Sequence, residues 1–239
     1  MNTDKLRVKV WRSETSGGLV SYEVPRYESQ TVLDVVTFIQ RQMQPDLAYR
    51  FACRVGMCGS CAMNVNGKAR WTCRTHVSKV AIGNELEIAP LSNLPVIKDL
   101  VTDMSAFFDK WSRAKGRFAG DRTRHEDFAN VRPDSAQRKE ADAGIECIGC
   151  GVCYSSCDVV TWRPDNLGPA ALNRAWTLVN DERDVQKIER LRAVAGDAGC
   201  HSCHTQGTCT ERCPKHLSPT AGIAGLKRMT MKAAREGDL

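Results

Sequence analysis

The sequence has 239 residues, 12 of them cysteine, and a formal net charge of +6, and its length allows one or two domains. No stretch approaches the roughly 18 consecutive apolar residues of a membrane span, and the opening MNTDKLRVKV lacks the apolar core of a secretory signal. With 26% charged residues the net charge is mild. This charge is compatible with a solvated surface, an acidic partner or an anionic membrane surface, and it does not by itself indicate nucleic-acid binding.

The N-terminal residues predict a hairpin followed by a helix. Leu6, Val8 and Val10 alternate with charged residues, which indicates a strand, and LVSYEV repeats the alternation. The Ser16-Gly17-Gly18 stretch between them can turn. TVLDVVTFIQRQM follows as a helix, with Thr31 as its N-terminal cap.

More strands are predicted after a glycine-rich loop, CRVGMCGSC. The Asn66-Gly67 pair in AMNVNGKARWTC is a strong signal for a type I′ hairpin, and NELEIAPL closes with another strand. Strands wrapped around one helix, with a cysteine loop after that helix, indicate a small α+β domain.

The first cysteine group has the spacing C-x4-C-x2-C-x11-C, which is typical of plant-type [2Fe–2S] sites. A tight loop can bring three thiolates to two irons, and a hairpin can return the fourth. Gly56 and Gly59 let the backbone approach and aim its N–H groups at the sulfides. The predicted ligands are Cys53, Cys58, Cys61 and Cys73. The alternative is a structural zinc site, although such sites usually pair C-x2-C with C-x2-C.

A domain boundary is expected near Asp103. The apolar spacing in VIKDLVTDMSAFFDKW predicts a helix that enters the second domain. The cysteine-free stretch from Trp111 to Ala143 is rich in charge and predicts a polar helix with a connector. The predicted domains are therefore residues 1–103 and 104–239.

The second domain holds two copies of one cysteine motif. CIGCGVCYSSC has the ferredoxin spacing C-x2-C-x2-C-x3-C, and the second copy reads C-x2-Q-x2-C-x3-C-P. In two-cluster ferredoxins the fourth cysteine of each run binds the other cluster. This exchange assigns four ligands to a [4Fe–4S] cluster: Cys147, Cys150, Cys153 and Cys213.

The other cluster receives only Cys157, Cys203 and Cys209, because Gln206 stands where a fourth cysteine is expected. A neutral amide is a poor iron ligand beside thiolates. The sequence therefore predicts a [3Fe–4S] cluster. The alternative is a labile [4Fe–4S] cluster with water or another donor on its fourth iron.

Cys200 is the one cysteine of the sequence that belongs to none of the three predicted ligand sets. A run beginning at Cys200 would read C-x2-C-x5-C-x3-C, which breaks the ferredoxin spacing. We expect a packed or free thiol there, with a ligand role as the alternative.

The three motifs, in this order and at this length, resemble the iron–sulfur subunits of succinate dehydrogenase and fumarate reductase. The resemblance covers nearly the whole chain. It includes CRVGMCGSC and CRT in the first domain, and CIGCGVCYSSC, DNLGPAALNRAW and CPKHLSPT in the second.

The resemblance implies a β-grasp first domain and an all-helical second domain. It also implies a role, which is electron transfer through three clusters from an FAD-containing flavoprotein subunit to quinone, beside membrane-anchor subunits. The chain itself has no G-x-G-x-x-G and no acid–base constellation, so we expect no dicarboxylate active site on it. The lack of a transit-like N-terminus favours a bacterial protein, peripheral on the cytoplasmic face of the inner membrane.

The resemblance further implies two quinone-site residues. In ubiquinone-reducing members a tryptophan lies five positions after the first ligand of the three-iron cluster, and here it is Trp162. A histidine follows the second ligand, and here it is His204. Packing is the alternative role for Trp162, and hydrogen bonding around the cluster or to a haem propionate for His204. Many members have proline where this chain has Asp158, which leaves the quinone type open.

Other functions remain open from the sequence. A quinol:fumarate reductase would use the same clusters to transfer electrons in the reverse direction, and the residues do not determine the direction of electron transfer. A ferredoxin-type adaptor of another iron–sulfur oxidoreductase is a second alternative, and a zinc protein is a third.

Overall fold

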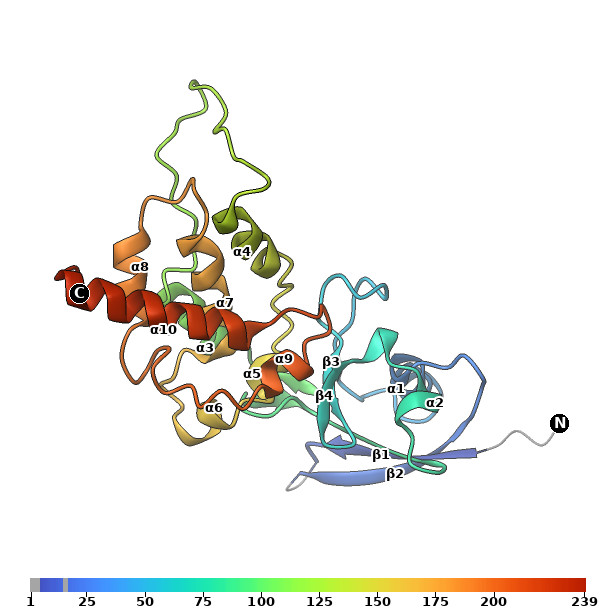
Figure 1. The fold of residues 1–239 in the computed structure, drawn as a ribbon. Helices are drawn as coiled ribbons and strands as arrows, with labels where there is room; N and C mark the ends of the chain where they lie inside the picture. Colours follow the sequence, from blue (N-terminus) through green and yellow to red (C-terminus); the bar gives the residue numbers. More distant parts are fainter. Residues whose placement is uncertain (1–4, 15–16) are drawn as a thin grey trace. The chain divides into compact units, whose positions relative to one another are not determined.

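The computed structural model describes residues 5–14 and 17–239 (Figure 1). The chain divides into two compact units, one of Met1–Met104 with Ile148–Ser156 and one of Ser105–Cys147 with Cys157–Leu239. The first unit combines strands and helices, and the second consists of helices and loops, which confirms the predicted fold class. The predicted turn at Ser16-Gly17-Gly18 begins at a residue outside the described part of the chain.

A five-stranded sheet organises the first unit. The strand order is β2-β1-β5-β3-β4, in which β1 and β5 pair in parallel and the other neighbours pair antiparallel. A central parallel pair flanked by two antiparallel hairpins is the β-grasp arrangement expected from the resemblance. The strands are β1 (Lys5–Arg12), β2 (Gly18–Pro25), β3 (Ala62–Val65), β4 (Lys68–Trp71) and β5 (Glu85–Ala89).

Helix α1 (Val32–Gln42) packs on the sheet, and its start is fixed by a capping box. The Thr31 hydroxyl accepts from the Asp34 N–H at 3.2 Å, and the Asp34 carboxylate accepts from the Thr31 N–H at 3.0 Å. The buried face of α1 meets the inward face of β1, where each buried aliphatic side chain contributes about 1.5–3 kcal/mol. The core includes Leu6, Val8, Val10, Val32, Val35, Val36 and Ile39.

The hairpin β3–β4 turns at Asn66-Gly67, as predicted. Both residues have positive φ angles, +48° and +72°, as a type I′ turn requires. The Asn66 side chain donates to the Val80 carbonyl and accepts from the Glu87 N–H, both at 2.7 Å. The turn is therefore held against β5 and the short helix α2 (Val77–Val80).

The helix predicted for residues 96–111 is wrong in its first half. Strands β6 (Val96–Lys98) and β7 (Val101–Thr102) form a small hairpin, and the helix α3 covers only Ser105–Arg113. The reason lies at Asp99, which has a left-handed φ of +47° and is fully buried. Its carboxylate accepts from Arg12 Nε at 3.1 Å, so the chain must turn there rather than continue as a helix.

The segment Ile148–Ser156 belongs to the first unit, although the predicted boundary assigned it to the second domain. It carries the short helix α5 (Val152–Ser155). The Ser92 N–H donates to Ser155 Oγ at 2.8 Å, and Asn93 Nδ2 donates to the Tyr154 carbonyl at 3.1 Å. These long-range bonds hold the segment on the loop after β5.

Helix α7 (Gly168–Val179) is the centre of the second unit, and α3, α4, α8 and α10 all pack against it (Figure 1). Trp176 of α7 packs against α10: a Cβ on Gly225 would stand 2.3 Å from its ring, and one on Gly222 would stand 3.0 Å from it. Two glycines thus permit the close crossing of these helices. The remaining bounds are α4 (Ala136–Ile145), α6 (Asp158–Trp162), α8 (Lys187–Val194), α9 (Thr208–Glu211) and α10 (Pro219–Glu236).

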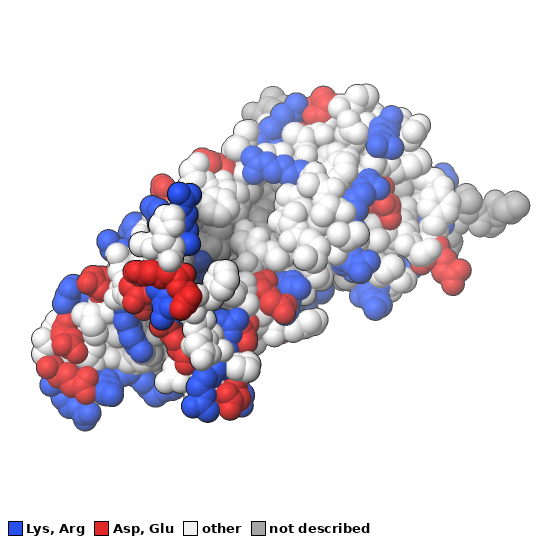
Figure 2. Space-filling model, turned by 90° about the horizontal axis from the view of Figure 1, so that it is seen from above, with Lys and Arg blue, Asp and Glu red and all other residues white. Residues whose placement is uncertain are grey.

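Among the residues that the structure describes, no helix is long and apolar enough to span a bilayer. On the face drawn in Figure 2, basic and acidic side chains are interspersed rather than gathered into one patch of a single sign.

Candidate iron–sulfur sites

The first cysteine group lies on the loop between α1 and β3 and on the 3-10 turn Thr72–Arg74 after β4. Cys53 Sγ accepts three backbone hydrogen bonds, from the N–H groups of Val55 at 3.5 Å, Met57 at 3.3 Å and Cys58 at 3.4 Å. These donors lower the pKa of Cys53 to about 6. The loop therefore favours a thiolate at Cys53, which is the form that binds iron.

Two glycines shape this loop. Gly56 and Gly59 have φ angles of +73° and +71°. A Cβ on Gly56 would lie 2.7 Å from the Trp71 ring, so the backbone must pass this ring without a side chain. The Gly56 N–H donates to Cys73, which places a backbone donor at a second predicted ligand.

Cys61 and Cys73 are buried side by side. Burial raises the pKa of Cys73 to about 11, with further contributions from a hydrogen bond and the charge of Cys61, and Cys53 is also within electrostatic reach. Two neighbouring thiolates repel each other, and bound cations remove that penalty. The donor-rich loop and this buried thiol pair fit a [2Fe–2S] cluster with Cys53, Cys58, Cys61 and Cys73 as ligands.

The second predicted ligand set is distributed over both units. Cys150 and Cys153 belong to the segment in the first unit, and Cys147 and Cys213 belong to the second unit. This [4Fe–4S] ligand set stays a prediction from the motif.

The third predicted set lies entirely in the second unit. Cys157 precedes α6, Cys203 follows a turn, and Cys209 lies in α9. Their thiols interact electrostatically with one another. Burial raises the pKa of Cys157, against the N–H groups of Val160 and Val159 that favour its thiolate.

Cys209 shows the same balance of effects. Burial raises its pKa, and the hydroxyls of Thr220 and Thr210 act against that rise. Cys157 and Cys209 therefore each have burial that disfavours an isolated charge and donors that favour the thiolate. Such a set fits an iron cluster, while the side chain of Gln206 is exposed.

Cys200 is a core residue. It is fully buried, and its Sγ lies 3.9 Å from Thr230 Oγ1, with Leu191 and Val194 in the same apolar cluster. His201 reaches the same hydroxyl through Nε2, at 2.9 Å. The packing role expected for Cys200 accounts for these contacts.

The two residues assigned to quinone by resemblance are both exposed. Trp162 ends α6, the helix that begins directly after Cys157, and 64% of its surface is accessible. His204 follows Cys203 on an exposed stretch of loop. Asp158 is exposed at the first position of α6, where a carboxylate is favoured by the helix dipole.

Two lysines near the third cysteine set were not predicted. Lys227 of α10 donates from Nζ to the Cys203 carbonyl at 2.6 Å. Lys110 of α3 donates to the Pro164 carbonyl at 2.6 Å and is within electrostatic reach of Cys157, and burial lowers its pKa. The sequence gives no signal for either lysine, because each is brought to the site by helix packing alone.

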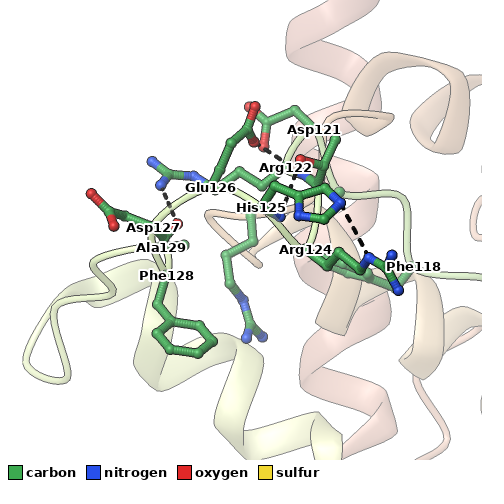
Figure 3. Close-up of a pocket in the computed structure, with 12 residues that line it drawn as sticks. Phe118, Asp121, Arg122, Arg124, His125, Glu126, Asp127, Phe128 and Ala129 are labelled. Carbon is green, nitrogen blue, oxygen red and sulfur yellow. Dashed lines mark hydrogen bonds between the residues drawn. The ribbon is translucent and has the colours of Figure 1, made fainter.

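A cavity of about 490 Å³ in the second unit lies within the loop 118–129, beside Arg183 (Figure 3). Two of its charged side chains are bonded inside the loop: Arg122 donates to the Asp127 carbonyl at 2.7 Å, and Glu126 accepts from the Thr123 N–H at 2.9 Å. The cavity has no cysteine in its lining, so it lies outside the predicted path of electrons.

Protein-family models match both the part of the chain with the first cysteine group and the part with the other two groups. Residues 5–109 match a 2Fe-2S iron-sulfur cluster binding domain, and residues 146–218 match a 4Fe-4S dicluster domain. These matches confirm the predicted iron–sulfur character, and the first sets aside the zinc alternative.

Relatives of both physiological directions are similar to the chain. The fumarate reductase iron-sulfur subunit of Escherichia coli O157:H7 is 35% identical over 202 residues, which cover 84% of this chain and 82% of that protein. The mitochondrial succinate dehydrogenase [ubiquinone] iron-sulfur subunit 1 of Oryza sativa subsp. japonica is 36% identical over 203 residues, covering 84% of this chain and 72% of that protein.

A solved structure agrees as well. A chain of the Mycobacterium smegmatis Sdh1 complex in the apo form superposes with a TM-score of 0.84 at 29% identity, covering 98% of this chain and 97% of that chain. The chain therefore belongs to the family of electron-transferring iron–sulfur subunits of succinate dehydrogenase and fumarate reductase, and is one subunit of that class of oxidoreductase.

Proposed function

We propose that this chain carries electrons between a flavoprotein subunit and a membrane quinone by means of three clusters, the last of which has three irons. The observation that carries the proposal is the third cysteine set. The proposal is supported by the place of Cys157, Cys203 and Cys209 in one unit, within electrostatic reach of one another, and by an exposed Gln206 where the motif would have a fourth cysteine.

Each ligand set has a separate part in the proposal. The clusters supply one-electron redox sites, so that a two-electron exchange at the flavin is passed on singly. The loop donors at Cys53 and Cys73 stabilise the thiolates of the [2Fe–2S] site. Cys147, Cys150, Cys153 and Cys213 hold the [4Fe–4S] cluster, and Cys157, Cys203 and Cys209 hold the [3Fe–4S] cluster.

Trp162 and His204 bind quinone at the far end of the path. An indole N–H can donate to a quinone carbonyl, and an imidazole can donate or relay a proton. Both side chains are exposed beside predicted ligands, as a site shared with membrane-anchor subunits requires. The chain is then held peripherally on the cytoplasmic face of the membrane by these anchors.

Either direction is compatible with this site, because the similar proteins include fumarate reductase and succinate dehydrogenase subunits. Direction depends on the potentials of the quinone and the clusters. Succinate oxidation and fumarate reduction rates, measured on one preparation of the purified complex, decide it.

The ligand assignment is tested by iron analysis and electron paramagnetic resonance of the purified complex. We expect about nine irons per chain, distributed over the three clusters, and three distinct signals. Cys73→Ala should remove the plant-type signal and leave the other two. Cys200→Ala is the matched control: it should leave all three signals and cost roughly 1 kcal/mol through a small core cavity. An unchanged plant-type signal in Cys73→Ala would overturn the ligand set.

A further inference from the structure

Thr220, at the start of α10, is placed to act on the thiolate of Cys209. Its Oγ1 lies 3.3 Å from Cys209 Sγ, within hydrogen-bonding distance for sulfur. Thr220 is ten positions from Thr210 in the chain, and the two hydroxyls lie 2.8 Å apart. This contact joins the first turn of α10 to α9, which carries Cys209.

Two hydrogen bonds between Thr220 and Thr210 have a defined donor. The Thr220 N–H donates to Thr210 Oγ1 at 3.3 Å, and the Thr210 hydroxyl donates in turn to Thr220 Oγ1. Because Thr220 Oγ1 already accepts from Thr210, its own proton is available for Cys209. A cysteine bound to iron is a thiolate and can only accept. The Thr220 hydroxyl therefore points its proton at the sulfur.

The backbone holds this hydroxyl in place. Ser218 caps α10 by accepting the Ala221 N–H, and Pro219 occupies the first position of the helix. One turn further, Gly222 lies against the Trp176 ring, so α10 cannot shift toward α7 without a clash. A donor fixed in this way loses little entropy when it bonds the sulfur.

We propose that Thr220 sets the reduction potential of the three-iron cluster by donating a hydrogen bond to Cys209 Sγ. The proposal rests on the three-iron assignment made above. A donor at a ligand sulfur stabilises the more negative, reduced state more than the oxidised state, so it raises the potential. Thr220 is thus a positioning residue, acting on the cluster through Cys209.

The test is a redox titration of the purified complex followed by electron paramagnetic resonance. Thr220→Val keeps the shape of the side chain and removes the donor. We expect its midpoint to move to lower potential by up to about 59 mV, which is a tenfold change in the ratio of reduced to oxidised cluster for one electron. Thr220→Ser should retain the wild-type midpoint, and Thr210→Val should give a smaller shift in the same direction.

Thr208→Val is the matched control, because Thr208 lies on the same turn as Cys209 but outside the relay. Its midpoint should equal that of the wild type. A normal three-iron signal in Thr220→Val with an unshifted midpoint would overturn the role of Thr220 alone. A wild-type complex without a three-iron signal would instead overturn the cluster assignment, so the two failures are distinguishable. If Thr220→Val fails to assemble, Thr220→Ala takes its place: a lower midpoint in that variant supports the donor, and an unshifted midpoint contradicts it.

Discussion

Gly59 of the [2Fe–2S] loop lies directly against Cys150, a predicted ligand of the [4Fe–4S] cluster. A Cβ on Gly59 would stand 2.5 Å from the Cβ of Cys150 and 2.8 Å from its Cα, closer than real atoms approach. Gly59 follows Cys58 in the chain. Because Gly59 has no side chain, its backbone can contact Cys150 within the first unit.

Gly59→Ala should displace Cys150 and alter the [4Fe–4S] signal. Gly67→Ala is the control, because Gly67 has nearly the same φ, +72° against +71°, and open space around it. Both variants should lose about 1–2 kcal/mol from the left-handed backbone. Only Gly59→Ala should also change the spectrum or the iron content, and identical spectra for the two variants would contradict the contact.

The buried ion pair between Arg12 and Asp99 should contribute strongly to the free energy of unfolding of the first unit. Both side chains are at most 2% exposed, and Asp99 also accepts from the Ser13 and Ala48 N–H groups at 2.9 Å. Asp99→Asn removes the buried carboxylate from the Arg12 guanidinium, which keeps its more exposed partners Glu14 and Asp46, at a cost of about 3 kcal/mol. In a thermal scan that follows [2Fe–2S] absorbance, we expect a midpoint roughly 6–12 °C lower.

Asp46→Asn provides the comparison, because Asp46 binds the same Arg12 guanidinium from a half-exposed position. Its loss should cost less than about 1 kcal/mol. Equal midpoints for the two variants would show that burial is not what makes the Asp99 contact strong.

Trp162→Leu should impair quinone reduction far more than reduction of a soluble dye that takes electrons upstream. Loss of one positioned donor costs roughly 1–3 kcal/mol, or about 10- to 100-fold. Phe128→Leu removes another exposed aromatic side chain from the same unit and should leave both rates unchanged. Equal losses in both assays for Trp162→Leu would point to packing instead.

Gln206→Cys should convert the three-iron cluster into a second [4Fe–4S] cluster, because it restores the complete cysteine run. The added thiolate favours the oxidised form, so the potential should fall and electron flow to quinone should slow. Gln206→Ser lacks a thiol and should keep three irons, and the exposure of this position makes both variants compatible with folding. Iron content and electron paramagnetic resonance spectra measure the outcome. An unchanged three-iron signal in folded Gln206→Cys would contradict the assignment of the three-iron cluster.

Local signals in the sequence predicted much of this molecule. The Thr31 cap, the Asn66-Gly67 turn and the alternation in β1 are each decided by neighbouring residues, and the structure has all three. The iron–sulfur character was equally readable, because the cysteine runs have ferredoxin spacing, and the two domain matches confirm that character.

Features that depend on distant contacts were missed. Residues 96–104 have apolar spacing close to that of a helix, but the buried bond from Asp99 to Arg12, 87 positions away, imposes a turn. The contact of Thr220 with Cys209 depends on how α10 packs beside α9, and the hydrophobic periodicity of the sequence does not predict that packing. Likewise, nothing in the motif CIGCGVCYSSC predicts that residues 148–156 complete the first unit.

That last feature has a consequence for synthesis and for engineering. The chain leaves the first unit after Met104, returns after Cys147 and leaves again after Ser156. On the ribosome, the first unit cannot be completed until residue 156 has emerged, although its sheet ends more than fifty residues earlier. For the same reason, no single cut of the gene separates the two modules, and exchanging one of them between relatives requires two segments to move together.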